Sequence, residues 1–248
     1  MKTINKIKYL LILSLFCGIC NAQSYWNIVT NWKDSVLQKI PTNKLDVNEL
    51  NKLDFSKIWI DNRTCYLGYI GNNFQRLHIE FIGIQKKNDT EYFVEGKSKV
   101  NLNECNFSGI FKIEDIRALK NKEYGVDNLM EGKIKEQGII IVDVNLKEDS
   151  IQRGSGIFKG LLITQWYLDN DNNLLYDDVR IDSDDYSNNQ FLGTWISYKT
   201  NVVKQCAWGH YRIPHSGDLD IGAGEFSVNE KYINNGWARE NICNEKNE

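Results

Sequence analysis

Between Trp59 and Arg212 the chain alternates apolar and polar residues with a period of two, which is typical of half-buried β-strands. Leu77, Ile79 and Phe81, for example, alternate with charged and polar neighbours. Nine or ten such runs follow one another with short polar connections and little helix between them. Because strands do not alternate regularly with helices, a parallel sheet is disfavoured. We expect a mainly β fold, an antiparallel meander that forms a barrel or a strongly bent sandwich.

Four of the predicted strands carry a glycine two residues after an aromatic residue: Tyr66–Gly68, Phe107–Gly109, Phe158–Gly160 and Phe191–Gly193. Positions i and i+2 of a strand lie on one face, so the aromatic ring can cover the space that the glycine leaves. Strongly curved sheets use glycine in this way. We therefore interpret the four positions as bending points. A compatible second interpretation is that they open room for a ligand at the mouth of a barrel.

One of these stretches also carries a family resemblance. Gly193-Thr194-Trp195 resembles the Gly-x-Trp strand signature of calycin-type barrels, the group of lipocalins, fatty-acid-binding proteins and avidins. In that group the motif opens the first barrel strand, whereas here it lies near the C-terminus. The resemblance implies a barrel-type binding module and carries over no particular ligand.

Residues 23–56 are predicted to form an N-terminal helical segment in front of a β-barrel-like domain, residues 57–248, with possible halves 57–116 and 134–213. Trp26, Val29 and Val36 fall roughly on one face at helical spacing, and Pro41 ends the pattern. We expect this amphipathic helix to pack its Trp-bearing face on the domain. A short C-terminal helix is predicted to begin at Ser227.

Residues 1–22 have the features of a secretory signal peptide: three lysines, an apolar run of about a dozen residues and a small-residue cleavage site. The run is shorter than the ~20 apolar residues that a spanning helix needs, so no membrane span is expected. We expect an exported protein, periplasmic or extracellular. Lipid anchoring at Cys17 or Cys20 is the disfavoured alternative, because a large residue precedes each cysteine.

The acidic balance of the chain bears on its partners. The whole chain has a formal net charge of −3, and residues 1–22 hold three lysines and no acid, so the remainder carries −6. This argues against nucleic acid, which needs clustered Lys and Arg, and against an anionic membrane surface. It allows a basic protein partner at the acidic stretch 169–185. An inhibitor or immunity-type protein is therefore one alternative function.

Four cysteines follow the signal segment, and an even number in an exported chain favours two disulfides. The expected pairs are Cys65–Cys105 and Cys206–Cys243, because each pair flanks one region of the predicted sheet.

Four residues occupy positions 1, 3, 5 and 9 of an EF-hand-like loop: Asp169, Asp171, Asn173 and Asp177. The pattern fails at Leu174, where a glycine is needed, and at Arg180, where a glutamate is needed. We interpret the stretch as a polar hairpin tip and expect no cofactor. A weak calcium site of another geometry is the alternative.

The segment His210–Glu225 contains His215 and three acidic residues, which are ligand-type groups for a metal or for a hydrolase. The spacing of the two histidines does not make them converge on a strand or a helix, and no nucleophile motif occurs. A hydrolase using this segment is the second alternative. We favour a non-enzymatic binding protein for a small apolar or glycan ligand. The expected ligand-binding residues are Trp166, Trp195, Trp208 and His210, with the three tryptophans walling a closed cavity.

Overall fold

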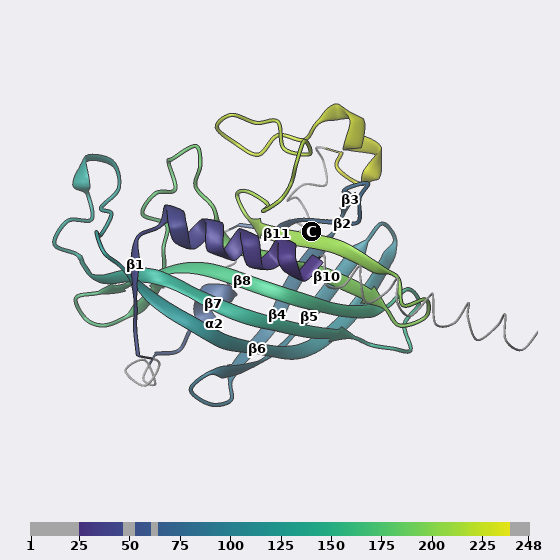
Figure 1. The fold of residues 1–248 in the computed structure, drawn as a ribbon, viewed down its shortest axis with the longest axis horizontal. Coiled ribbons are helices and arrows are strands. Elements are labelled where there is room, and N and C mark those ends of the chain that lie inside the picture. The colour runs from purple at the N-terminus through teal and green to yellow at the C-terminus, as the bar shows by residue number, and fades with distance from the viewer. Residues whose placement is uncertain (1–24, 47–52, 61–63, 239–248) are drawn as a thin grey trace, which may run out of the picture.

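The computed structural model describes residues 25–46, 53–60 and 64–238, and shows one antiparallel sheet that curls into a half-barrel (Figure 1). The predicted signal peptide lies outside the described residues. The strands are β1 (Thr42–Lys44), β2 (Leu67–Ile70), β3 (Gln75–Arg76), β4 (His78–Lys86), β5 (Glu91–Val100), β6 (Asn103–Leu119), β7 (Ile134–Glu148), β8 (Gly156–Asp169), β9 (Leu174–Tyr176), β10 (Asn188–Ser197) and β11 (Val203–His210). The mainly β fold class is thus confirmed.

The strand order is β3-β2-β11-β10-β8-β7-β6-β5-β4, with β1 added to β6 and β9 added to β8. Strands from both predicted halves share this sheet, because β6 pairs with β7. The two ends of the order, β3 and β4, are separated along the chain by one residue, Leu77. The Leu77 N–H donates to the Gly68 carbonyl at 2.9 Å. One continuous segment therefore contacts β2 at its start and β5 along its length.

Alternate residues of several strands enter two different hydrophobic clusters. In β7, Ile140, Val142 and Val144 belong to the inner cluster, whereas Ile139 and Ile141 belong to the outer one. The same division holds in β8, β10 and β11. In these four strands the period of two thus marks two buried faces, whereas β4, β5 and β6 bury one face and expose residues such as Glu80 on the other, as the sequence predicts.

One of the four aromatic–glycine pairs, Phe191–Gly193, has its ring over the glycine as the sequence predicts. At Gly68, Gly109 and Gly160 the nearest atoms come from other segments instead. A Cβ built on Gly193 would lie 2.5 Å from a ring carbon of Phe191 and 2.8 Å from the Cα of Gly160, its partner on β8. The phenylalanine ring therefore covers the glycine, and the two backbones approach more closely than alanine would allow.

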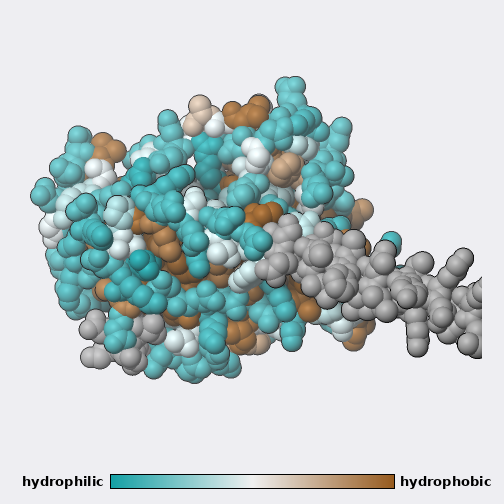
Figure 2. All heavy atoms as spheres, in the orientation of Figure 1, coloured by the Kyte–Doolittle hydropathy of each residue, from teal (hydrophilic) through white to brown (hydrophobic). Residues whose placement is uncertain are grey.

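The N-terminal helix spans residues 25–39 and lies across the outer face of the sheet (Figure 1). Val29 and Trp32 are its buried residues and pack with the outer side chains of β7 and β8. Trp26, in contrast, is 45% exposed, so only part of the predicted face is in contact. Hydrophilic residues cover most of the surface on this side, interrupted by patches of hydrophobic residues (Figure 2).

The C-terminal part of the outer face is covered by residues 213–237. The short helix here is the 3-10 helix η3 (Glu230–Asn235), which is capped by Asn229 and not by Ser227 as predicted. Ser227 is instead held in an extended turn, where its N–H donates to Asp220 Oδ1 at 3.1 Å. Trp237 closes this region, with its indole N–H bonded to the Phe74 carbonyl at 2.6 Å.

A second helix, α2 (Ser56–Trp59), lies inside the half-barrel. Its Trp59 is fully buried and makes edge contacts with Tyr92 and Phe111. The Trp59 indole N–H donates to Thr164 Oγ1 at 3.1 Å, and Asn189 Nδ2 donates to the Ile58 carbonyl at 2.9 Å. This helix therefore fills one end of the interior and is anchored there by hydrogen bonds to β8 and β10.

Candidate functional site

Two of the three tryptophans expected to wall a cavity are packed in the core. Trp166 and Trp208 are both 0% exposed. Trp208 stacks on Phe191 with ring centroids 3.6 Å apart and meets Phe158 edge-on. At these two positions the interior is occupied by side chains, so neither tryptophan faces a space for a ligand.

His210 also belongs to this packed interior. It is 0% exposed, its Nδ1 lies 2.9 Å from the Tyr176 hydroxyl, and its ring lies 4.1 Å from that of Tyr66. His215 is exposed on the other side of the sheet, where its carbonyl accepts a bond from the Tyr69 hydroxyl. The two histidines therefore face different environments and do not form a common site.

Two of the three acidic residues of the His210–Glu225 segment have structural partners. Asp218 accepts bonds from Lys231 and Tyr232, and Asp220 pairs with Arg212 at 2.6 Å. Within the part of the chain that the structure describes, no group of three or more His, Cys, Asp or Glu residues is arranged to hold a metal ion.

The proposed calcium ligands lie in two places. Asp169 and Asn173 form the tip of the β8–β9 hairpin, where Asp169 Oδ1 accepts from the N–H groups of Asp171 and Asn173. Asp177 is 5% exposed and bonded to Gln137 Nε2 at 2.7 Å and to the Val179 N–H. Asp169 thus organises a tight turn, as the hairpin-tip interpretation expects.

The predicted disulfide pairs are wrong. Cys105 and Cys206 are both buried free cysteines, which breaks the Cys65–Cys105 pair and the Cys206–Cys243 pair. Cys206 points into the inner cluster from β11, whereas Cys105 lies on β6 with its sulfur close to the Arg153 carbonyl. Flanking the same sheet region in sequence did not bring the sulfurs together. Cys243 lies outside the described residues.

Trp195, the third predicted tryptophan, lines a cavity of about 510 Å³ at the end of the half-barrel opposite to α2. The lining residues come from β5, β7 and β10, from β2, β3, β8 and β11, and from the hairpins that connect β5 to β6 and β7 to β8. Apolar walls are supplied by Ile70, Val100 and Phe158. We call this cavity the mouth pocket.

A buried carboxylate holds the Trp195 ring in the wall of the mouth pocket. Glu148, at the end of β7, accepts from the Trp195 indole N–H at 2.9 Å, from the Gly156 N–H at 2.7 Å and from the Ser98 hydroxyl. Burial raises the pKa of the Glu148 carboxyl, and the three donors oppose that rise. Three elements, β5, β8 and β10, are therefore tied to one carboxylate.

The rim of the mouth pocket is formed by polar and basic side chains. Lys204 stands opposite Trp195 in the β10–β11 pairing, and its Nζ lies 5.6 Å from the centre of the indole ring. Arg153 contributes from the β7–β8 hairpin. Gln75 Nε2 donates to Asn101 Oδ1 at 2.8 Å and so links β3 to the β5–β6 hairpin. This bond fixes one side of the opening.

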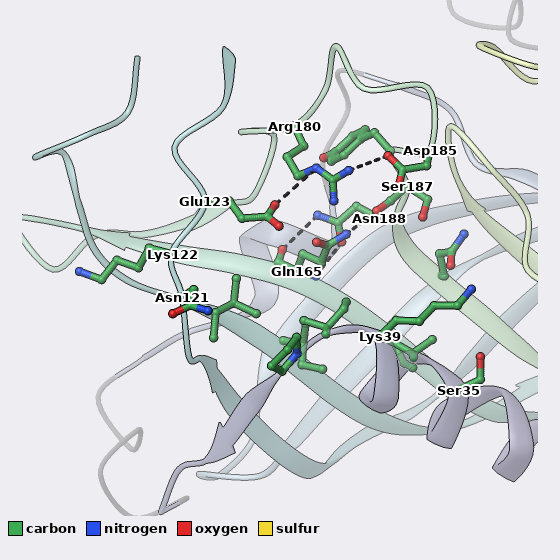
Figure 3. A pocket seen from close by; sticks show the side chains of 18 of the residues that line it. Ser35, Lys39, Asn121, Lys122, Glu123, Gln165, Arg180, Asp185, Ser187 and Asn188 are labelled. Atoms are coloured by element: carbon green, nitrogen blue, oxygen red, sulfur yellow. Dashed lines mark hydrogen bonds and ion pairs between the residues drawn. The ribbon is translucent and has the colours of Figure 1, made fainter. Parts of the chain in front are cut away.

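A second cavity, of about 570 Å³, lies on the outer face between the N-terminal helix and the loops after β6 and β9 (Figure 3). Arg180 crosses its upper edge, with Asp185 at 2.7 Å and Glu123 at 3.4 Å. Gln165 and Asn188 lie below, joined by two hydrogen bonds. In Figure 3 these polar groups are thus bonded to one another, whereas Ser35, Lys39, Asn121 and Lys122 show no bond to the other residues drawn.

The chain was compared with known proteins, and no family model, no curated protein and no solved structure matches it. Among the described residues, no helix has the length and apolar character needed to cross a membrane. The fold and the site define the chain as an antiparallel β half-barrel with a packed interior and a pocket at one end. The half-barrel is compatible with the architecture that Gly193-Thr194-Trp195 suggested, and no match supports the calycin group in particular.

Sequence reasoning missed the residues around Trp195. Glu148 follows Val144 and Leu146 on the inner face of β7, so the sequence places an acidic residue at an inward-facing position. Lys204 occupies the inward position before Cys206 on β11 in the same way. A charged residue that replaces an apolar one at the end of an inward-facing series indicates where an interior opens to solvent.

Proposed function

We propose that this chain is an exported, non-enzymatic binding protein that holds a small, largely apolar ligand in the mouth pocket. The observation that carries the proposal is the pocket itself, about 510 Å³ in volume with Trp195 in its wall. Pockets for small molecules usually measure ~300–1,000 Å³ and combine apolar walls with a few fixed polar groups. The mouth pocket has both properties.

The anchoring of Trp195 supports this function. A large aromatic side chain contributes most to binding when it is held in one orientation before the ligand arrives. Glu148 supplies that restraint through the 2.9 Å bond to the indole N–H. The opposite end of the interior is filled by α2, so a ligand within the half-barrel is confined to the mouth.

The proposal is tested with the neutral fluorescent probe N-phenyl-1-naphthylamine, whose emission rises in apolar surroundings. We expect saturable binding of one probe per chain to the wild type. Val100→Trp fills the pocket from its half-buried wall and should lower the affinity at least tenfold. The matched control, Val126→Trp, adds the same side chain at a position that is 57% exposed and does not line the mouth pocket. Equal affinity in both variants would overturn the proposal.

A second function, inhibition or neutralisation of a basic protein, is supported by the charge distribution. Residues 169–185 contain seven aspartates and one arginine, a formal net charge of −6. Asp182, Asp184 and Asp185 are exposed there, and such a patch complements a cationic partner. Wild-type protein should recover a basic protein from the exported fraction of its host. Triple Asp→Asn substitution should abolish that recovery, whereas neutralising Glu80, Asp89 and Glu95 should not.

A further inference from the structure

The mouth pocket differs in charge from the rest of this acidic chain. Three charged residues line it, the basic Lys204 and Arg153 and the acidic Glu148. The described part of the chain contains no salt bridge from either basic residue to an acid. The lining therefore carries a net positive charge in a protein whose overall charge is negative.

Lys204 is directed to the pocket by strand register. It pairs with Trp195 across β10 and β11, and directly paired residues of antiparallel strands lie on the same face. Further along β11, Cys206 and Trp208 belong to the inner cluster, so Lys204 stands at the inward position nearest the opening. Its ammonium group lies over the indole ring of Trp195 at 5.6 Å, a cation–π contact.

Glu148 does not neutralise these two basic groups. One of its oxygens accepts from the Ser98 hydroxyl, and the other accepts from Trp195 Nε1 and the Gly156 N–H. Its carboxylate is thus engaged with the pocket wall. It forms no salt bridge with Lys204 or Arg153, although all three residues line the same cavity. The basic groups at the rim are left available for a negative group from outside.

We infer that the ligand of the mouth pocket is a small amphipathic anion, and this inference rests on the function proposed above. Its apolar body would lie against Trp195 and Phe158, and its negative group would lie between Lys204 and Arg153 at the rim. Charge-assisted hydrogen bonds from lysine and arginine are the interactions that favour an anion over a neutral molecule of the same shape. Carboxylates, sulfonates and phosphate monoesters share this chemistry.

The test uses two probes that differ by one group. 1-Anilinonaphthalene-8-sulfonate has the ring skeleton of N-phenyl-1-naphthylamine plus a sulfonate, so the ratio of their dissociation constants measures the preference for an anion. We expect the wild type to bind the sulfonate about tenfold more tightly. Lys204→Met should weaken sulfonate binding about three- to fivefold, the size expected for one exposed ionic contact. Binding of the neutral probe should change less than twofold.

Matched variants and competitors separate the possible outcomes. Lys199→Met removes an exposed lysine outside the pocket lining and should change neither constant. The anions 1-naphthoate and 1-naphthyl phosphate should displace the bound sulfonate, whereas the neutral 1-naphthamide should not. The stronger of the two anionic competitors identifies whether a carboxylate or a phosphate is preferred. Thermal unfolding of each variant checks that it is folded.

Three results would overturn the inference, and they can be told apart. Equal binding of the neutral and anionic probes, unaffected by Lys204→Met but lost in Val100→Trp, would refute the anion and leave the binding function intact. Binding of neither probe would refute both. Sulfonate binding that survives Val100→Trp would place the anion at another site and would also count against the inference.

Discussion

Glu148 ties the mouth pocket together, and its removal should cost much of the stability of that end of the protein. Glu148→Ala deletes the acceptor for the Trp195 indole N–H and for the Gly156 N–H. Both donors are in buried residues, since Trp195 is 8% exposed and Gly156 is also buried. The Ser98 hydroxyl can rotate to a new partner, whereas the two N–H groups are fixed by the ring and by the backbone.

The size of the loss follows from these two donors. A buried polar group left without its partner costs about 1–3 kcal/mol. Two orphaned donors therefore predict a loss of about 3 kcal/mol in the free energy of unfolding, allowing for water that enters from the pocket. For a chain of this size the melting temperature should fall by about 6–12 °C.

Glu148→Gln is the matched control, because an amide oxygen can accept both N–H bonds while its NH₂ group donates to Ser98. We expect this variant to stay within about 1 kcal/mol of the wild type at neutral pH. Urea unfolding followed by circular dichroism measures both variants. A Glu148→Ala variant as stable as Glu148→Gln would refute the reasoning, because the three bonds would then contribute nothing to stability.

Three further predictions concern pH, packing and the C-terminal segment. Because burial raises the pKa of Glu148, the part of the stability that comes from protonating this carboxyl is fully present below about pH 4 and is lost as pH rises through the raised pKa, while its hydrogen bonds remain. Glu148→Gln should therefore flatten the pH dependence of urea midpoints above pH 4. Gly193→Ala should lower the unfolding free energy by more than about 2 kcal/mol in the same assay, since its Cβ would lie 2.2 Å from a carbonyl oxygen. In the control, Gly83→Ala, the new Cβ meets nothing closer than 3.9 Å, and the unfolding free energy should change by less than about 1 kcal/mol. Arg212→Lys should speed amide hydrogen exchange across 213–237 measured by mass spectrometry, because lysine cannot reproduce the four guanidinium bonds to this region and the fifth to the Asp184 carbonyl. Unchanged exchange would contradict that role.

The strands were predictable because their signal is local. Inward residues such as Ile140, Val142 and Val144 repeat every second position, and this period survives whatever lies opposite them. The Phe191–Gly193 pair was predictable for the same reason, since the ring covers the glycine within a single strand. Both features depend on neighbours two residues away.

The pocket was not predictable in the same way, because it depends on depth along the half-barrel. Trp166, Trp195 and Trp208 have similar sequence surroundings and all point inward. Only Trp195 lies near a strand end at the opening, whereas the end of β11 near Trp208 pairs with the start of β10, at the other end of the half-barrel. The other two are enclosed by aromatic residues such as Phe55 and Phe191 from other segments. Which side chains cover a tryptophan depends on strand register and on α2, and neither can be read from one strand.

The two ends of the half-barrel have opposite chemistry, and this separation makes the two proposed functions compatible. The acidic residues 169–185, with a net charge of −6, begin at the end of β8 and include β9, which contacts α2, whereas the lining of the mouth pocket is net positive. A small anion would be repelled from the first region and attracted to the second. A basic partner would be favoured at the first and disfavoured at the second. If both ligands bind, neutralising Asp182, Asp184 and Asp185 should weaken the partner without changing affinity for the anionic probe, and Lys204→Met should do the reverse.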